Sequence, residues 1–406
     1  MKKLLHVICA ILSLCMLFSM IGCNSTDNHS TDDPTDAPTD KPTEKPTEAP
    51  TEKPTETPTE KPTEKPTEKP TEKPARPIVS AAYSLSDDWR SFKICGRVQY
   101  VKDGMVCDFT ASGIEFSGVM KEEVVIELDC SDDTYFTVFI DGERVDERFF
   151  ADSKTESLTI ADFGDEAAEH TVRFLKQTEP QQSLALLKTV VITGYIDEYP
   201  PEDKEYYIEF VGDSLTAAYG NIGEPSAPDP GSARWQDGTQ SYAFLACEEL
   251  NADYTIAACS GVGIDKGWTH FSIKDFYNKE SFYRGSMNSH YDGRTPDIIV
   301  INLGTNDQDC GSSENGFKTK MIALIEYLRE SHGENVPIIW AYNFGGYGCD
   351  SWAFDVIKQL GGEKNEIYTF KMTYNNEGAN GHPDLEAHYA GADELVKFIK
   401  DKGLLD

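Results

Sequence analysis

The sequence is poor in the patterns that build metal centres and disulfide frameworks. Its 8 histidines and 10 cysteines include neither a Cys-x-x-Cys pair nor a His cluster, so we expect no metal and no other cofactor. Cys9, Cys15 and Cys23 fall at the N-terminus, which leaves an odd number for the rest of the chain. Exported proteins that rely on disulfides usually carry an even, dense set. We therefore expect mostly buried free thiols.

Basic residues are scarce as well. The 37 Lys and Arg against 70 Asp and Glu give a formal net charge of −33. The Thr/Pro tract before residue 78 contains nearly as many Lys as Glu, so most of the acidity lies in the globular part. Such a surface repels nucleic acid and anionic membranes, and a neutral substrate fits it better. The 406 residues, 39% of them hydrophobic, suffice for two or three domains.

No N-terminal apolar run is long enough to span a bilayer. Lys2 and Lys3 precede an apolar stretch that begins at Leu4 and ends near Phe18, shorter than the ~20 residues that a spanning helix needs. Met20-Ile21-Gly22-Cys23 then resembles a bacterial lipobox. We predict a lipoprotein signal peptide over residues 1–22 and lipidation of Cys23, with ordinary signal cleavage and release as the alternative.

Residues 23–77 are predicted to form a stalk. From Pro34 to Pro74 a proline recurs at every fourth position, and no residue in this tract is large and apolar. Such a tract cannot collapse, and it favours extended polyproline II at about 3.1 Å per residue, so forty residues reach roughly 130 Å. The stalk can serve as a bare spacer through the cell wall or carry O-glycans.

Residues 78–200 show the pattern of an all-β domain. Short apolar or alternating runs are separated by turn residues, as in Val124–Leu128, Tyr135–Ile140 and His170–Leu175. This favours a β-sandwich, in particular a jelly roll. Such a domain can bind carbohydrate or simply pack against its neighbour.

Residues 201–406 alternate strand and helix patterns. Strands are predicted at Tyr207–Val211, Tyr254–Ala258, Asp297–Leu303, Pro337–Asn343 and Ile367–Met372. Helices are predicted at Tyr242–Leu250, Phe317–Glu330, Trp352–Leu360 and Leu385–Lys400. Apolar strands with helical crossovers indicate a parallel sheet covered on both faces, which binds ligands beyond the carboxyl ends of its strands.

Four short motifs fall at that edge. Gly212-Asp213-Ser214-Leu215 follows the first strand, and we expect Ser214 to open a helix and to present its hydroxyl. Without the other motifs, Asp213-Ser214 would be interpreted as an ordinary pair of helix-capping residues. Ser260-Gly261 follows the second strand, and Gly263 is an alternative to Gly261 as an amide donor to the oxyanion. Gly304-Thr305-Asn306-Asp307 follows the third strand. A glycine amide and an Asn side chain are suitable oxyanion donors, although both residues are also common in plain turns.

The fourth motif is Gly381-His382-Pro383, on a loop before the last helix. His382 is the candidate base, whereas its nearest competitor, His388, lies inside that helix and is expected to be structural.

These motifs resemble the conserved blocks of SGNH (GDSL-like) hydrolases. With the preceding β domain and Phe139-Ile140-Asp141-Gly142, the chain is most similar to carbohydrate esterase family 2, the acetyl xylan esterases, over residues 80 to 406. The resemblance implies an α/β SGNH-hydrolase-like three-layer domain with a parallel sheet, preceded by an all-β jelly-roll sandwich domain. It also implies a Ser214–His382 acyl-enzyme mechanism, with the Ser214 and Gly261 amides and the Asn306 side chain as the oxyanion hole.

One position departs from the pattern of SGNH enzymes. Most of them carry an Asp three residues before the His, where this chain has Ala379. The missing acid could be replaced by Glu377, Asp350 or Asp384. Carbohydrate esterase family 2, which the chain resembles, also includes enzymes that orient the His through a backbone carbonyl, and we therefore favour a Ser–His dyad.

The predicted substrate is acetylated plant polysaccharide, either acetyl xylan or glucomannan. Trp235, Trp268, Tyr347 and Trp352 are candidate sugar contacts because flat apolar rings suit pyranose faces, whereas Trp340 lies in a strand and is assigned to the core. We expect an extracellular, cell-surface monomer that meets the membrane only through its anchor at Cys23. The alternatives are a peptidoglycan O-acetyl or lipid esterase, or a non-catalytic carbohydrate-binding surface protein.

Overall fold

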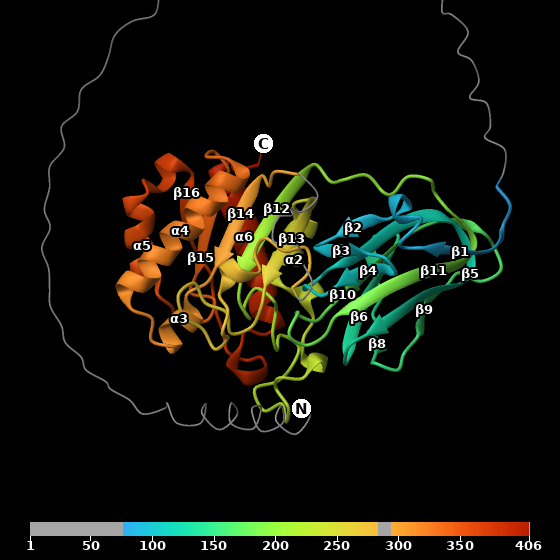
Figure 1. The fold of residues 1–406 in the computed structure, drawn as a ribbon, viewed down its shortest axis with the longest axis horizontal. Helices are drawn as coiled ribbons and strands as arrows, with labels where there is room; N and C mark the ends of the chain where they lie inside the picture. Colours follow the sequence, from blue (N-terminus) through green and yellow to red (C-terminus); the bar gives the residue numbers. More distant parts are fainter. Residues whose placement is uncertain (1–75, 283–293, 406) are drawn as a thin grey trace, which may run out of the picture. The chain divides into compact units, whose positions relative to one another are not determined.

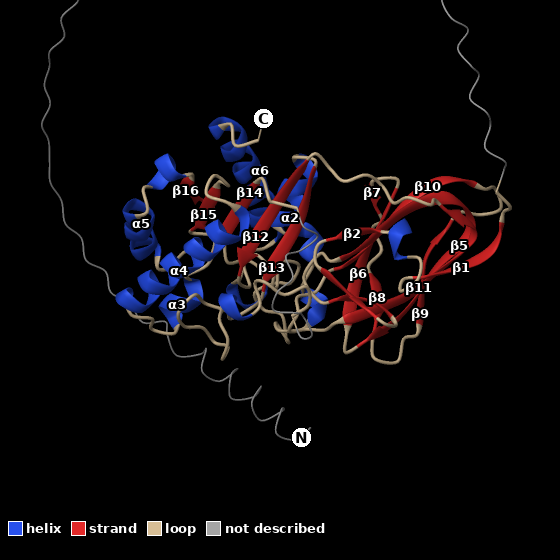
Figure 2. Cartoon of the chain, turned by 45° about the horizontal axis from the view of Figure 1, so that its top comes forward, coloured by secondary structure: helices blue, strands red, loops and turns tan. Residues whose placement is uncertain are grey.

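The computed structural model describes residues 76–282 and 294–405 (Figure 1). The predicted signal peptide, Cys23 and nearly all of the predicted stalk lie outside these residues. No helix within the described ranges is long and apolar enough to cross a membrane. The described residues form an antiparallel sheet of eleven strands followed by a parallel sheet of five strands (Figure 2).

The eleven strands confirm the expected all-β region. They are β1 (Val79–Ser84), β2 (Lys93–Cys95), β3 (Val98–Val101), β4 (Gly104–Cys107), β5 (Gly113–Cys130), β6 (Thr134–Ile140), β7 (Glu143–Arg144), β8 (Phe149–Ala151), β9 (Ser157–Asp162), β10 (Ala168–Lys176) and β11 (Ala185–Ile196). The three runs singled out in the sequence lie in β5, β6 and β10.

The long strand β5 folds this region around one core. Its first part pairs with β10, and beyond Glu122 it pairs with β9 instead, while β11 accompanies most of its length. Glu122 has a φ of 57°, a left-handed conformation that interrupts the regular strand where the partner changes. Side chains from both parts of β5, such as Phe116 and Ile126, are fully buried in the same core.

The parallel sheet has the strand order β13-β12-β14-β15-β16. Its strands are β12 (Tyr206–Gly212), β13 (Ala252–Ala258), β14 (Ile298–Asn302), β15 (Ile338–Tyr342) and β16 (Ile367–Lys371). The helices are α2 (Tyr242–Glu249), α3 (Thr305–Asp309), α4 (Glu314–His332), α5 (Asp350–Gln359) and α6 (Leu385–Lys402). Each strand and helix predicted here is confirmed to within a few residues, and the short α3 was not predicted.

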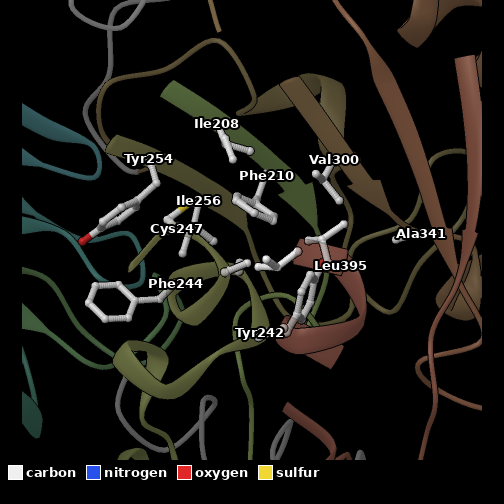
Figure 3. Close-up of a cluster of buried hydrophobic side chains, with 14 of the residues drawn as sticks. Ile208, Phe210, Tyr242, Phe244, Cys247, Tyr254, Ile256, Val300, Ala341 and Leu395 are labelled. Carbon is white, nitrogen blue, oxygen red and sulfur yellow. The ribbon is translucent and has the colours of Figure 1, made fainter. Parts of the chain in front are cut away.

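Helices cover both faces of this sheet. Successive residues of β12 point to opposite sides: Phe210 packs with α2 and α6, and Val211 packs in the cluster that α4 and α5 complete. Figure 3 shows the first cluster, in which Tyr242 of α2 and Leu395 of α6 lie near Phe210, while Phe244 of α2 lies near Tyr254 of β13. Both clusters are buried, as a parallel sheet requires.

Buried ion pairs join the all-β region to the parallel-sheet region. Arg173 of β10 makes a two-pronged contact with Glu248 of α2, with N–O distances of 2.9 and 2.5 Å. Lys93 of β2 lies 2.8 Å from Asp253 of β13. The two cations are buried, whereas Glu248 and Asp253 are partly exposed. Breaking either pair would leave a buried positive charge without its partner, which disfavours other arrangements of the two regions.

The remaining cysteines have the expected state. All seven are free thiols, and Cys310 alone among them is partly exposed. Burial raises the pKa of thiols such as Cys95 and Cys107 well above the usual range, so they stay protonated and behave as small apolar side chains.

Candidate active site

Three predicted site segments meet because three neighbouring parallel strands end together. Gly212 at the end of β12 lies opposite Ala258 of β13 on one side and Asn302 of β14 on the other. Ser214, Gly261 and Asn306 each follow one of these strand ends within a few residues. The register of the sheet therefore brings the three segments to one edge, as the sequence predicts.

Ser214 and His382 form a hydrogen-bonded pair at this edge. The Nε2 atom of His382 lies 2.9 Å from the Oγ atom of Ser214, although 168 positions separate the residues in the sequence. The Ser214 residue is 8% exposed and His382 is partly exposed, so both can be reached from one side. This is the geometry in which a histidine accepts the proton of a serine hydroxyl.

A backbone carbonyl, rather than a carboxylate, orients the His382 ring. Its Nδ1 atom lies 3.3 Å from the carbonyl oxygen of Asn380, which has a left-handed backbone conformation with a φ of 57° and a ψ of 30°. The bond places the Nδ1 proton, so Nε2 is left as the acceptor that faces Ser214. Burial lowers the pKa of His382 to about 4, against the opposing effect of the Asn380 and Ala379 carbonyls. The ring is therefore neutral at physiological pH.

The three alternative acids are not hydrogen-bonded to His382 in the described residues. The Asp384 carboxylate caps α6 by accepting from the Ala387 amide at 3.0 Å, and it also accepts from Asn375 at 2.7 Å. Asp350 lies in the first turn of α5, and Glu377 is exposed. In the described residues no hydrogen bond joins any of the three to His382.

The helix that Ser214 was expected to open does not form, and this prediction is wrong. A series of turns follows the serine, and Ala218 and Gly220 take left-handed φ values of 62° and 72° that end helical propagation. The carbonyl of Gly220 accepts from the amide of Ala379 at 2.9 Å. The turns thus fasten the Ser214 segment to the loop that carries His382.

Two backbone amides at the edge are available to a ligand. Within the described residues, no group accepts a hydrogen bond from the amide of Ser214 or from that of Gly261. Gly261 has a φ of 75°, and a Cβ atom there would lie 3.1 Å from the Cβ of Trp268, so glycine suits the position. The rival Gly263 is packed more tightly, because its Cβ would lie 1.9 Å from the Lys266 carbonyl oxygen.

Asn306 lies in the first turn of α3 and joins the other two segments. Its Nδ2 atom donates to the Asp213 carboxylate at 3.1 Å and to the Val262 carbonyl at 2.9 Å. Both amide hydrogens are thus engaged next to Ser214 and Gly261. Asn306 holds the edge together, and it must exchange one of these bonds in order to donate to an oxyanion.

Two carboxylates that the sequence reasoning left without a role support this edge. Asp213 is fully buried, which raises its pKa to about 7, against the hydrogen bonds from Leu215 and Asn306. Asp307, also fully buried, accepts from the backbone amides of residues 264, 265 and 266 at 2.7 to 2.9 Å. Asp307 therefore fixes the loop that follows Gly261. The sequence feature that could have indicated these roles is that both residues lie inside the quoted motifs, directly beside Ser214 and Asn306.

The candidate sugar contacts differ in exposure. Trp268, 47% exposed, donates its amide to the Gly261 carbonyl at 2.8 Å and so lies beside the candidate oxyanion site. Tyr347 is 45% exposed, and its carbonyl accepts from Thr305 next to Asn306. Trp352 packs partly buried against Phe317 in the core below, which leaves less of its ring for a ligand. Trp340 is buried, as expected.

The fold and these motifs define a class of hydrolase, and comparison with known proteins agrees. Residues 208–390 match the family of GDSL-like lipases and acylhydrolases. Residues 94–197 match the N-terminal domain of carbohydrate esterase 2. The chain thus joins a GDSL-like hydrolase domain to the N-terminal domain of carbohydrate esterase family 2. Within the described residues, no group of three or more His, Cys, Asp or Glu is arranged to hold a metal ion.

Individual curated relatives match this chain over different shares of its length. The cellulase/esterase CelE of Acetivibrio thermocellus is 25% identical over 74% of this chain and 38% of its own length. An acetylxylan esterase / glucomannan deacetylase of Cellvibrio japonicus is 27% identical over 41% of this chain and 50% of its own length. The chain therefore spans half or less of the length of these two curated relatives.

A solved structure extends the comparison. A family two carbohydrate esterase from Clostridium thermocellum, in complex with cellohexaose, is 25% identical and covers 77% of this chain and 100% of its own, with a TM-score of 0.65.

Proposed function

We propose that this chain is a serine esterase that removes O-acetyl groups from plant cell-wall polysaccharide, acetyl xylan or glucomannan. The observation that carries the proposal is the 2.9 Å contact between His382 Nε2 and Ser214 Oγ at the carboxyl edge of the parallel sheet. The neutral His382 contacts this hydroxyl, and the amides of Ser214 and Gly261, which donate to no described group, follow neighbouring strand ends at the same edge. These are the groups that acyl transfer needs.

The reaction proceeds in two steps. Ser214 Oγ attacks the acetyl carbonyl carbon while His382 Nε2 takes the hydroxyl proton, and the tetrahedral intermediate then expels the sugar oxygen, which His382 protonates. Water, deprotonated by the same ring, releases acetate from the acyl-enzyme. The amides of Ser214 and Gly261 and the side chain of Asn306 stabilise the oxyanion, and each donor contributes about 3 kcal/mol.

Three observations support a neutral polysaccharide as the substrate. One curated relative is named for acetylxylan and glucomannan, and the solved relative is in complex with cellohexaose. The exposed rings of Trp268 and Tyr347 flank the catalytic edge. The net charge of −33 disfavours anionic polymers.

The placement of the enzyme outside the cell is part of the proposal. Residues 1–22 are the lipoprotein signal, Cys23 carries the lipid, and residues 23–77 hold residues 78–200 and 201–406 away from the membrane as a monomer. The lipobox and the proline repeat support this arrangement.

The test measures acetate released from acetylated xylan, acetylated glucomannan and O-acetylated peptidoglycan, with a long-chain ester for comparison. We expect release from the plant polysaccharides by the parent and none by Ser214→Ala, with equal melting temperatures because Ser214 contributes little core volume. Faster release from peptidoglycan or from the long-chain ester would favour those esterase alternatives. Retention on polysaccharide without any acetate would identify a binding protein.

A further inference from the structure

The orientation of the Gly261 amide depends on the carbonyl group of the residue before it. In a planar trans peptide, the C=O of residue 260 and the N–H of residue 261 point in opposite directions within one rigid unit. Whatever holds the Ser260 carbonyl therefore sets the direction of the Gly261 N–H. In this protein the holding groups come from the all-β region.

The segment that connects β10 to β11 supplies two side chains to this peptide. Gln181 Nε2 donates to the Ser260 carbonyl oxygen and lies 3.2 Å from the Cys259 sulfur. The Glu179 carboxylate accepts from the Ser260 amide at 2.6 Å. The two peptide units on either side of Ser260 are thus both fixed from outside the hydrolase domain.

The supporting segment is itself rigid. Glu179 is 1% exposed, and its own amide donates to Gln236 Oε1 at 3.1 Å. The fully buried Lys176 ammonium donates to the Thr178 carbonyl at 2.6 Å and to the Glu179 carbonyl at 3.3 Å. A segment held in this way can impose its geometry on the turn that it contacts.

We propose that Gln181 and Glu179 are positioning residues through which the all-β region aligns the Gly261 amide with the developing oxyanion. The inference rests on the proposed esterase function. It assigns the all-β region a part in the chemistry that does not depend on sugar binding. Because only a correctly aimed donor stabilises the transition state, loss of these contacts lowers kcat and leaves KM nearly unchanged.

The chain offers a matched control next to Gln181. Gln182 has the same side chain, lies in the same segment and also reaches the hydrolase domain, where it donates to the Gly231 carbonyl at 3.0 Å. On a soluble acetyl ester, we expect Gln181→Ala to lose about tenfold to a hundredfold in kcat, with KM within twofold of the parent. Gln182→Ala should keep both constants within twofold. Gln181 is exposed, so its truncation removes no core volume.

A pair of variants at Glu179 tests the second contact. Glu179→Gln keeps an acceptor for the Ser260 amide and should retain kcat within about threefold. Glu179→Met has similar volume but no carboxyl or amide acceptor, and it should lose as much kcat as Gln181→Ala. Melting temperatures recorded in parallel separate a folding defect from misalignment.

The outcomes separate this inference from the proposed function. A parent that releases no acetate would refute the function itself. An active parent whose kcat survives Gln181→Ala would overturn the positioning role while the function stands. A raised KM with unchanged kcat would also overturn it, since Gln181 would then contact substrate. Equal kcat losses in Gln181→Ala and Gln182→Ala would mean that the segment acts through packing alone.

Discussion

At the residue scale, the central feature is that His382, the proposed base, has no hydrogen bond to a carboxylate in the described residues. A buried acid would stabilise the imidazolium that forms during acyl transfer, whereas the Asn380 carbonyl supplies only a partial negative charge. The low pKa of His382, about 4, reflects burial that this carbonyl does not offset. The ring is thus unprotonated at neutral pH, and in the proposed mechanism the oxyanion donors provide much of the transition-state stabilisation.

The dyad makes a direct prediction about the neighbouring acids. Removing the carboxylate from an enzyme built around a triad costs about 10⁴ in turnover. Here Glu377→Gln, Asp350→Asn and Asp384→Asn, made singly, should each keep kcat within about tenfold of the parent, because none of these groups contacts His382 in the described residues. His382→Ala should be nearly inactive. A thousandfold loss in one amide variant with unchanged folding would identify that residue as the missing acid.

Asn306 is expected to matter twice, as an oxyanion donor and as a link between segments. Asn306→Ala should lower kcat by roughly a hundredfold or more, because it removes one donor and leaves the Val262 carbonyl and the Asp213 carboxylate without its amide. Steady-state kinetics on a soluble acetyl ester measure the effect. A loss below threefold would reduce Asn306 to a turn residue.

At the element scale, helix α6 stabilises the start of helix α2 through a buried histidine. The Nδ1 atom of His388 accepts a hydrogen bond from the Tyr242 amide at 3.1 Å, and the residue is fully buried. The first amides of a helix have no partner within the helix, so this side chain acts as a cap from another element. Protonation at Nδ1 would destroy the bond. Burial lowers the pKa of His388 to about 3; the charge of Asp384 opposes this shift and that of His382 adds to it. The ring therefore stays neutral and keeps the bond at neutral pH.

The depressed pKa of His388 predicts how stability depends on pH. The unfolded histidine titrates near 6.5 and the folded one near 3, so between these values the unfolded chain binds the extra proton and stability falls as pH falls. From pH 6.5 to pH 5 this group should lower the unfolding free energy by about 1 to 2 kcal/mol. His388→Asn keeps an acceptor for the Tyr242 amide but does not titrate.

Urea unfolding of the parent and of His388→Asn at both pH values provides the measurement. Between pH 6.5 and pH 5, the unfolding free energy of the variant should fall by about 1 to 2 kcal/mol less than that of the parent. Identical differences in the two proteins would mean that His388 is protonated without cost in the folded state.

At the scale of the whole molecule, the all-β region and the hydrolase domain share buried contacts. The Arg173–Glu248 and Lys93–Asp253 pairs fix their arrangement, and the segment between β10 and β11 then reaches the turn after β13. With the proposed positioning of Gly261, these contacts give the all-β region a role in the proposed chemistry. The N-terminal tract has a different proposed role, which is to hold the folded regions away from the membrane.

The anchor and the stalk are tested in the intact chain. The mature protein should begin at Cys23 and partition with membranes, and Cys23→Ala should be released, as measured by fractionation and N-terminal mass spectrometry. Shortening the Pro-Thr repeat should spare activity on a soluble ester and lower it on insoluble wall material, because a shorter polyproline segment reaches less far. Equal losses on both substrates would contradict a spacer role, and a parent found wholly in the medium would contradict the anchor.

The sequence by itself determined the strands of the parallel sheet, four of the helices beside it and the edge where the candidate site lies. Apolar runs such as Ile298–Leu303 indicate a buried parallel strand, and the carboxyl ends of adjacent parallel strands share one edge, so the motifs that follow them converge. The resemblance to SGNH hydrolases then singled out Ser214 and His382, which the structure places 2.9 Å apart.

Only the tertiary structure decided how each group is held. The segment after Ser214 is not helical because Ala218 and Gly220 adopt left-handed conformations, and Gly220 binds the His382 loop. The same loop turns the Asn380 carbonyl to His382, and Gln181 reaches Ser260 from another region of the chain. The contacts of Gly220 with Ala379 and of Gln181 with Ser260 join residues that lie far apart in the sequence. Local propensity and periodicity carry no information about such pairings, which depend on how complete elements pack.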